Sequence, residues 1–197
     1  MATAVLDAPK TMTLEEFLAL PDDGTERMLL KGVVWEIGEG NGMTRRNRFH
    51  SSCEMRIGRI LANWAESQPH PRPEVVGGEA GFVLSRSPDH STSVGIDVAV
   101  ISAELADSEV DDSWMYEGLP ILAVEILSPS DTIKEISAKL KTYRECGVPV
   151  VWTVDTDHRT VTEHRPDREP KMYTKADTIA AEPHLPGFSC AVSAFFR

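Results

Sequence analysis

The sequence has few cysteines, and none of them are paired at a metal-binding spacing. Cys53, Cys146 and Cys190 are odd in number and lie far apart in the chain. The absence of any CxxC pair argues against a disulfide framework and against a structural zinc site. Because proteins with free thiols are typical of reducing compartments, we expect a cytoplasmic location.

A long apolar run is also missing. No stretch reaches the ~20 residues that a membrane-spanning helix needs, so we expect no membrane partner. Residues 1–10 have neither the basic start nor the apolar block of a secretory signal, and we expect them to form a disordered leader. The remainder, residues 11–197, is long enough to bury one core and is expected to form a single domain.

The chain lacks an excess of basic residues. It has 20 Lys and Arg against 31 Asp and Glu, a formal net charge of −11. This balance argues against a broad basic face for binding a phosphate backbone. It does not exclude a nuclease, because a bound metal can invert the local field at an acidic site. Arg45, Arg46 and Arg48 form the densest basic cluster, which could contact phosphate or belong to a solvated loop.

Hydrophobic periodicity predicts an α/β (α+β) protein with a mixed β-sheet flanked by helices. The expected helices cover residues 13–20, 49–64 and 132–145, and an N-terminal β-hairpin turns at Lys31-Gly32. Strands are expected over residues 74–76, 81–84, 94–101, 119–127, 148–155 and 159–164, with short strands after 172. The acidic stretch 104–112 favours a loop or a short helix. The strand, helix and strand between residues 119 and 155 predict a right-handed βαβ unit.

Two carboxylates lie in strands that are otherwise apolar. Glu125 is within residues 119–127, and Asp97 is within residues 94–101. Burying a carboxylate is costly unless a cation or hydrogen bonds compensate it. Carboxylate oxygens are also the ligands that Mg²⁺ prefers. If the two strands are neighbours, Asp97, Glu125 and the backbone carbonyl of Ile126 could hold Mg²⁺ or Mn²⁺, and the metal would activate a bound water.

A lysine on the next helix completes the candidate site. The apolar stripe of this helix consists of Ile133, Ile136, Leu140 and Tyr143. Lys139 flanks the stripe, whereas Lys134 and Lys141 lie on the opposite flank. The Lys139 ammonium could orient the attacking water or balance charge in the transition state. As alternatives, Lys139 is a surface residue or only a salt-bridge partner of Glu125, and Asp97 is only a strand-end residue.

Three further residues have both a functional and a structural interpretation. His50 opens a helix and could approach the site as an auxiliary residue. Glu79 could be an additional acidic ligand, although a loop charge is favoured. Cys53 lies three residues after His50, which suggests a thiol nucleophile, but small buried cysteines commonly just pack in a helix.

These residues resemble the Uma-type restriction endonuclease family, a branch of the PD-(D/E)XK nuclease superfamily. The resemblance extends from Thr13 to Phe188 and is strongest in these segments: Val124-Glu125-Ile126-Leu127-Ser128-Pro129-Ser130, Lys139 with Tyr143, Gly147-Val148-Pro149 and Val151-Trp152-Thr153-Val154-Asp155. It implies a restriction-endonuclease-like core in which the catalytic lysine has moved from the strand to the helix, at Lys139. His50 matches the histidine that opens the long helix of the family, and Glu26 matches its early glutamate.

The sequence departs from the family pattern at several positions. Ile96 replaces the proline before the acid, Val33 replaces the glutamate after Gly32, and residues 44–47 replace a Ser-Pro segment. These departures concern substrate contacts more than the metal site.

The favoured hypothesis is a Mg²⁺-dependent DNA endonuclease with Asp97, Glu125 and Lys139 as its catalytic residues. The alternative is a nuclease-fold module that binds nucleic acid or protein and cleaves weakly or not at all, and a small phosphoester hydrolase is a third option. A homodimer is expected, because a two-fold pair is the commonest assembly. The apolar tail, residues 191–196, could be a dimer contact or part of the core.

Overall fold

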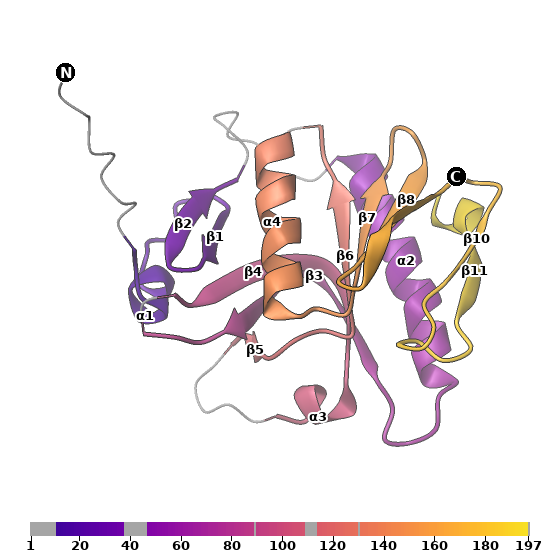
Figure 1. Cartoon of the computed structure of the whole chain (residues 1–197), viewed down its shortest axis with the longest axis horizontal. Helices are drawn as coiled ribbons and strands as arrows, with labels where there is room; N and C mark the ends of the chain where they lie inside the picture. The colour runs from indigo at the N-terminus through magenta and orange to yellow at the C-terminus, as the bar shows by residue number, and fades with distance from the viewer. Residues whose placement is uncertain (1–10, 38–46, 89, 109–113, 130, 197) are drawn as a thin grey trace.

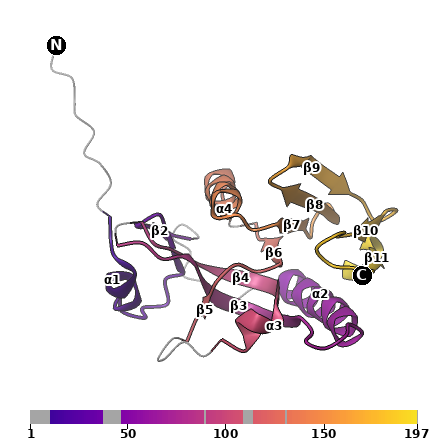
Figure 2. The same ribbon diagram turned by 60° about the horizontal axis from the view of Figure 1, so that its bottom comes forward.

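The protein is a mixed β-sheet with a long helix on each side. The computed structural model describes residues 11–37, 47–88, 90–108, 114–129 and 131–196. Within these ranges nine strands form one sheet and two more form a small separate hairpin. Figure 1 shows α4 in front of the sheet, and Figure 2 shows α4 and α2 on opposite faces of it. The fold is therefore the mixed sheet flanked by helices that the sequence predicts.

The sheet has the order β2-β1-β4-β6-β7-β8-β9, with β3 and then β5 added beside β4. Its strands are β1 (Arg27–Leu30), β2 (Val33–Glu36), β3 (Glu74–Ser85), β4 (Thr92–Ile101), β5 (Tyr116–Glu117), β6 (Leu122–Leu127), β7 (Val150–Asp155), β8 (Thr160–Arg165) and β9 (Arg168–Tyr173). The separate hairpin is β10 (Thr178–Ala180) with β11 (Ser189–Ala191). Most neighbours are antiparallel, but β6 and β7 run parallel, as do β3 and β5.

The helices begin and end where capping residues allow it. They are α1 (Leu14–Leu18), α2 (Arg48–Glu66), α3 (Ala103–Ala106) and α4 (Ile133–Cys146), followed by the 3₁₀ turn η1 (Val192–Phe195). The side chains of Thr13 and Thr132 form capping boxes at the starts of α1 and α4, as the sequence predicts. Gly147 ends α4 at φ 90°, a conformation that suits glycine. None of the described helices has the length and hydropathy of a membrane span.

Each face of the sheet buries its own apolar cluster. On one face α2 packs over β4, β6 and β7, and the C-terminal segment covers the rest of that face. On the other face the buried residues of β1, β3 and β4 join those of α4, β6 and β7. The parallel pair β6–β7 lies at the centre and is buried from both sides. Its strands are apolar on both faces for this reason, apart from Glu125 and polar positions such as Thr153.

The structure corrects the predicted strands before residue 101. Residues 74–76 and 81–84 belong to one strand, β3, rather than two. A register shift between Gly77 and Ala80 interrupts its pairing with β4. Gly78 and Glu79 have positive φ angles there, 76° and 58°. A β-bulge of this kind bends a strand without ending it, which an interruption of the apolar pattern alone cannot distinguish from a loop.

The C-terminal tail is part of the core. Val192 and Phe195 are both fully buried, and the Phe195 ring lies 6.0 Å from that of Trp152. The alternative interpretation of residues 191–196 as a dimer contact is therefore wrong for these two side chains. The predicted leader, residues 1–10, lies outside the described residues, as do Arg45, Arg46 and part of the acidic stretch. The division into a leader and one domain stays a prediction.

Candidate active site

Asp97 and Glu125 come together where β4 and β6 separate. The last antiparallel pair of these strands is Val98 with Val124. One more step in the same register would place Asp97 opposite Glu125. Instead, the backbone amide of Ile126 donates a 2.7 Å hydrogen bond to Oδ2 of Asp97. The aspartate side chain thus takes the place of a backbone acceptor, and both carboxylates line one pocket.

Asp97 is buried against the first turns of α2. Its Oδ2 lies 3.4 Å from Nε2 of His50, a side chain that is only 1% exposed. Burial opposes ionisation of Asp97, but the hydrogen bond and charge of His50, the Ile126 amide and the Lys139 ammonium together lower its pKa below the ordinary value. Asn47 positions His50, because it caps α2 and accepts hydrogen bonds from the amides of Phe49 and His50. Asp97 is thus held as a carboxylate.

Glu125 is held by two side chains of α4. Nζ of Lys139 lies 2.8 Å from Oε2 of Glu125 and also donates to the carbonyl of Gly95 at 2.9 Å. The hydroxyl of Tyr143 donates to the other oxygen, Oε1. Burial raises the pKa of Glu125, the Lys139 ammonium lowers it, and the Asp97 charge raises it again, with a net rise. A further cation at this place would therefore favour the ionised pair of acids.

The pocket that these residues line is strongly acidic. Six carboxyl side chains and one ammonium, that of Lys139, are among its lining residues, and the acids are Glu26, Glu79, Asp97, Glu125, Asp131 and Glu135. The sequence favours a loop charge for Glu79, but this residue lies within β3 at the bulge and lines the pocket. The bulge is tied to α2, since the Gly78 amide donates to Glu54 at 2.9 Å. The pocket has the charge of a cation site.

The donor set fits a hard divalent cation. Among the described residues both contacts of Asp97 fall on Oδ2, so Oδ1 is available as a ligand. Each oxygen of Glu125 has one partner and retains a further lone pair. No group of three or more His, Cys, Asp and Glu side chains in the described part of the chain is arranged to hold a metal. Mg²⁺ commonly binds only one or two carboxylates and takes its other ligands from water and phosphate.

The structure brings together most of the residues that the sequence singles out. Asp97, Glu125 and Lys139 line one pocket with Ile126 and Glu79, and His50 contacts Asp97 from α2. Their roles in binding a metal or in catalysis stay predictions. Cys53 is buried in α2, as the packing interpretation expects. The sequence pattern places Ile133 in the apolar stripe of α4, but it is 84% exposed because it is the first residue of the helix.

The sequence pattern places Tyr143 in the apolar stripe of α4 and does not predict its hydrogen bond to Glu125. One signal for this contact is present in the sequence, because Tyr143 follows Lys139 by four residues and shares its helix face. A buried tyrosine hydroxyl normally needs a polar partner, and the nearest polar strand residue is Glu125. The carbonyl of Gly95 as an acceptor for Lys139 had no signal in the sequence, since it depends on where β4 passes beneath α4.

Comparisons with known proteins agree with this architecture. The profile of the Uma2 family, described as "Putative restriction endonuclease", matches residues 14–193. The chain also resembles a solved structure from Anabaena variabilis, described as a "putative nuclease belonging to DUF820". The TM-score is 0.76 with 18% sequence identity, and the match covers 94% of this chain and 97% of the other. This likeness shows the fold. Among curated proteins, no sequence matches the chain.

Proposed function

The chain belongs to the Uma2 family, and on this premise we propose that it is a metal-dependent DNA endonuclease that hydrolyses phosphodiester bonds. The observation that carries the proposal is the pocket in which Asp97, Glu125 and Lys139 meet. Two acids and a lysine on neighbouring core elements provide what phosphodiester hydrolysis needs. The acids are ligands for Mg²⁺ or Mn²⁺, and the lysine is a cation beside the reacting phosphate.

In this proposal each residue has a separate task. Asp97, Glu125 and the Ile126 carbonyl would hold the metal, which supplies an activated water and polarises the phosphate. Lys139, anchored by Glu125 and Gly95, would place its ammonium near the developing negative charge. Tyr143 holds the Glu125 carboxylate from its other side, and His50 holds that of Asp97. Glu79 is the nearest auxiliary candidate on β3.

A binding module without cleavage is the second candidate. It is favoured by the ion pair itself, because Lys139 and Tyr143 already satisfy both oxygens of Glu125. Such a cluster can be retained for structure alone. The net charge of −11 also disfavours tight binding of a duplex by one chain.

We further propose that the endonuclease is a homodimer and that it is located in the cytoplasm. The location is proposed because the three cysteines are free.

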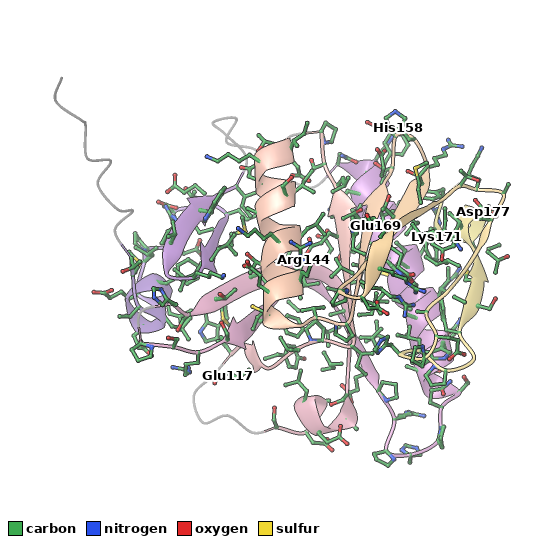
Figure 3. All side chains as sticks on the ribbon, viewed as in Figure 1. Glu117, Arg144, His158, Glu169, Lys171 and Asp177 are labelled. Carbon is green, nitrogen blue, oxygen red and sulfur yellow. The ribbon has the colours of Figure 1, made fainter. Side chains whose placement is uncertain are left out.

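Metal binding and cleavage measured on the same variants test the proposal. Asp97→Asn keeps an acceptor for the Ile126 amide but removes the negative charge. We expect calorimetry to show Mn²⁺ binding to the wild type and none to Asp97→Asn, with plasmid cleavage abolished in parallel. Glu169→Ala, at an exposed acid of β9 labelled in Figure 3, is the control and should behave as wild type. Equal Mn²⁺ affinity in wild type and Asp97→Asn would refute the metal site.

A further inference from the structure

A second cavity lies at the same end of the sheet, on the face that α2 covers. It is lined by the first two turns of α2, the β7–β8 turn and the end of η1. Three arginines surround it, Arg48, Arg56 and Arg159, together with the aromatic side chains of Phe49 and Phe196. We call this cavity the arginine groove. The first turn of α2 and the β7–β8 turn lie at the upper edge in Figure 1, and Figure 3 labels His158, the neighbour of Arg159 in that turn.

The three guanidinium groups of the groove are without carboxylate partners in the described part of the chain. Some other basic residues of the protein have carboxylate partners, among them Arg27, Arg86 and Arg165. The groove contains one acid, Asp157, against its three arginines. In a chain with a net charge of −11, this is a local concentration of free positive charge. It suits a ligand that carries several negative charges.

The spacing on α2 places two of these arginines, Arg48 and Arg56, in one row along the helix. Arg48, Ser52 and Arg56 are each four residues apart, so their side chains lie on one face of the helix. Phe49 is 55% exposed, and the Arg48 guanidinium lies 4.6 Å from the centre of its ring. An exposed ring beside two arginines of one helix face is a combination with which proteins bind an unpaired nucleic-acid strand. The cations contact phosphates, and the ring stacks on a base.

The groove and the candidate active site share their supporting elements. His50, in the first turn of α2, contacts Asp97. Its neighbours Phe49 and Ser52 line the groove. Cys53, in the wall of the groove, lies close enough to Asp97 for that charge to raise its pKa. On β7, Thr153 lines the acidic pocket, and Thr156, just after this strand, lines the groove. The groove on the α2 face and the carboxylates on the α4 face are therefore connected through α2 and the end of β7.

We propose that the arginine groove binds a single nucleic-acid strand through its phosphates, with one base stacked on Phe49, next to the candidate active site. This inference rests on the proposed function for its biological meaning, but it can be tested independently of cleavage. A single strand suits the groove better than a duplex, because only an unpaired base can stack on Phe49. It also reconciles an acidic protein with a nucleic-acid substrate, because the contact needs only a few cations.

Fluorescence anisotropy with a fluorescein-labelled oligothymidylate, measured in EDTA so that no divalent metal is present, tests the groove. We expect the double variant Arg56→Gln/Arg159→Gln to bind at least tenfold more weakly than wild type. The dependence of log K on log salt concentration should become shallower by about 0.7 for each phosphate that the protein no longer neutralises. Phe49→Ala should weaken binding about tenfold without changing this slope, because stacking releases no counterions.

Three controls make these results specific. Arg144→Gln, at an exposed arginine of α4 labelled in Figure 3, should bind as wild type. The variant Arg56→Lys/Arg159→Lys keeps both charges and should keep the salt slope, which excludes a failure to fold as the cause. A duplex of matched length should bind more weakly than the single strand.

The outcomes separate the groove from the proposed function. Equal binding by wild type and the double glutamine variant would overturn the groove, whether or not the protein cuts DNA. Tighter binding of the duplex, or displacement of the strand by heparin with no effect of Phe49→Ala, would also overturn it. Binding that depends on the groove, in a protein that cleaves nothing with any metal, would support the groove and refute the endonuclease.

Discussion

At the scale of the residue, Lys139 has two tasks. Its ammonium balances the charge of the buried Glu125 carboxylate, and it is the proposed catalytic cation. The side chains of Lys139 and Glu125 are only 18% and 13% exposed. We expect Lys139→Ala to lower plasmid cleavage by ~10²–10³. We also expect it to destabilise the fold by about 3 kcal/mol, since removing one partner leaves a buried charge. Cleavage assays and denaturant unfolding of the same protein measure both effects.

A double variant separates the two tasks of Lys139. Glu125→Gln/Lys139→Met removes both charges and keeps similar side-chain volumes, so it should be nearly as stable as wild type but should not cleave. Lys141→Ala, at an exposed position of the same helix, is the control for both measurements. A stable Lys139→Ala protein that cuts DNA at the wild-type rate would remove Lys139 from the mechanism.

Cys53 is expected to be the least reactive of the three thiols. The pKa of Cys53 is raised to about 12, mainly by burial. The charge of Arg56 lowers this pKa, and the charge of Asp97 raises it further. Because of this raised pKa, the fraction of Cys53 that is thiolate at pH 8 is small and increases only as the pH rises toward 12. The thiolate is the reactive form of cysteine. Iodoacetamide labelling at pH 8, followed by peptide mass spectrometry, should modify the half-buried Cys146 and Cys190 first. Labelling of Cys53 as fast as the others would revive it as a nucleophile.

At the scale of the element, α4 determines where Lys139 and Tyr143 lie. Thr132 caps this helix, accepting from the Glu135 amide at 3.2 Å, while the Glu135 carboxylate accepts from the Thr132 amide at 2.7 Å. We expect Thr132→Ala to cost about 1 kcal/mol of unfolding free energy, because one helix amide then has no acceptor. Urea denaturation measures the change. Thr132→Ser retains the hydroxyl and should stay near wild type, and equal stability of the two variants would contradict the role of the cap.

At the scale of the whole molecule, a homodimer is the expected assembly. Nucleases of this kind that cut both strands of a duplex commonly use two copies, and two-fold pairs are the commonest oligomers. The surface involved cannot be the side chains of Val192 and Phe195, because both are fully buried in the core. Light scattering coupled to gel filtration should give twice the mass of one chain. A monomer at high protein concentration would contradict the dimer and fit an enzyme that acts on one strand, as the arginine groove suggests.

The sequence by itself determined most of the helices and strands and the candidate site residues of this protein. Helix ends follow from local rules, so Thr132, Glu135 and Gly147 predicted the ends of α4. The acids Asp97 and Glu125 were recognisable because a carboxylate in an apolar strand needs compensation from elsewhere. The position of Lys139 beside the apolar stripe of α4 predicted that it reaches the sheet. These features depend on residues close together in the chain.

Only the tertiary structure decided which distant groups meet. The contact of His50 with Asp97 and the hydrogen bonds of Lys139 to Gly95 and of Tyr143 to Glu125 join separate elements. They depend on how α2 and α4 pack on the two faces of the sheet. The bulge at Glu79 is likewise invisible in the sequence, since only its pairing with β4 distinguishes a bent strand from a loop. The physical reason is the same in each case: periodicity records which face of an element is buried, whereas packing against other elements decides what that face touches.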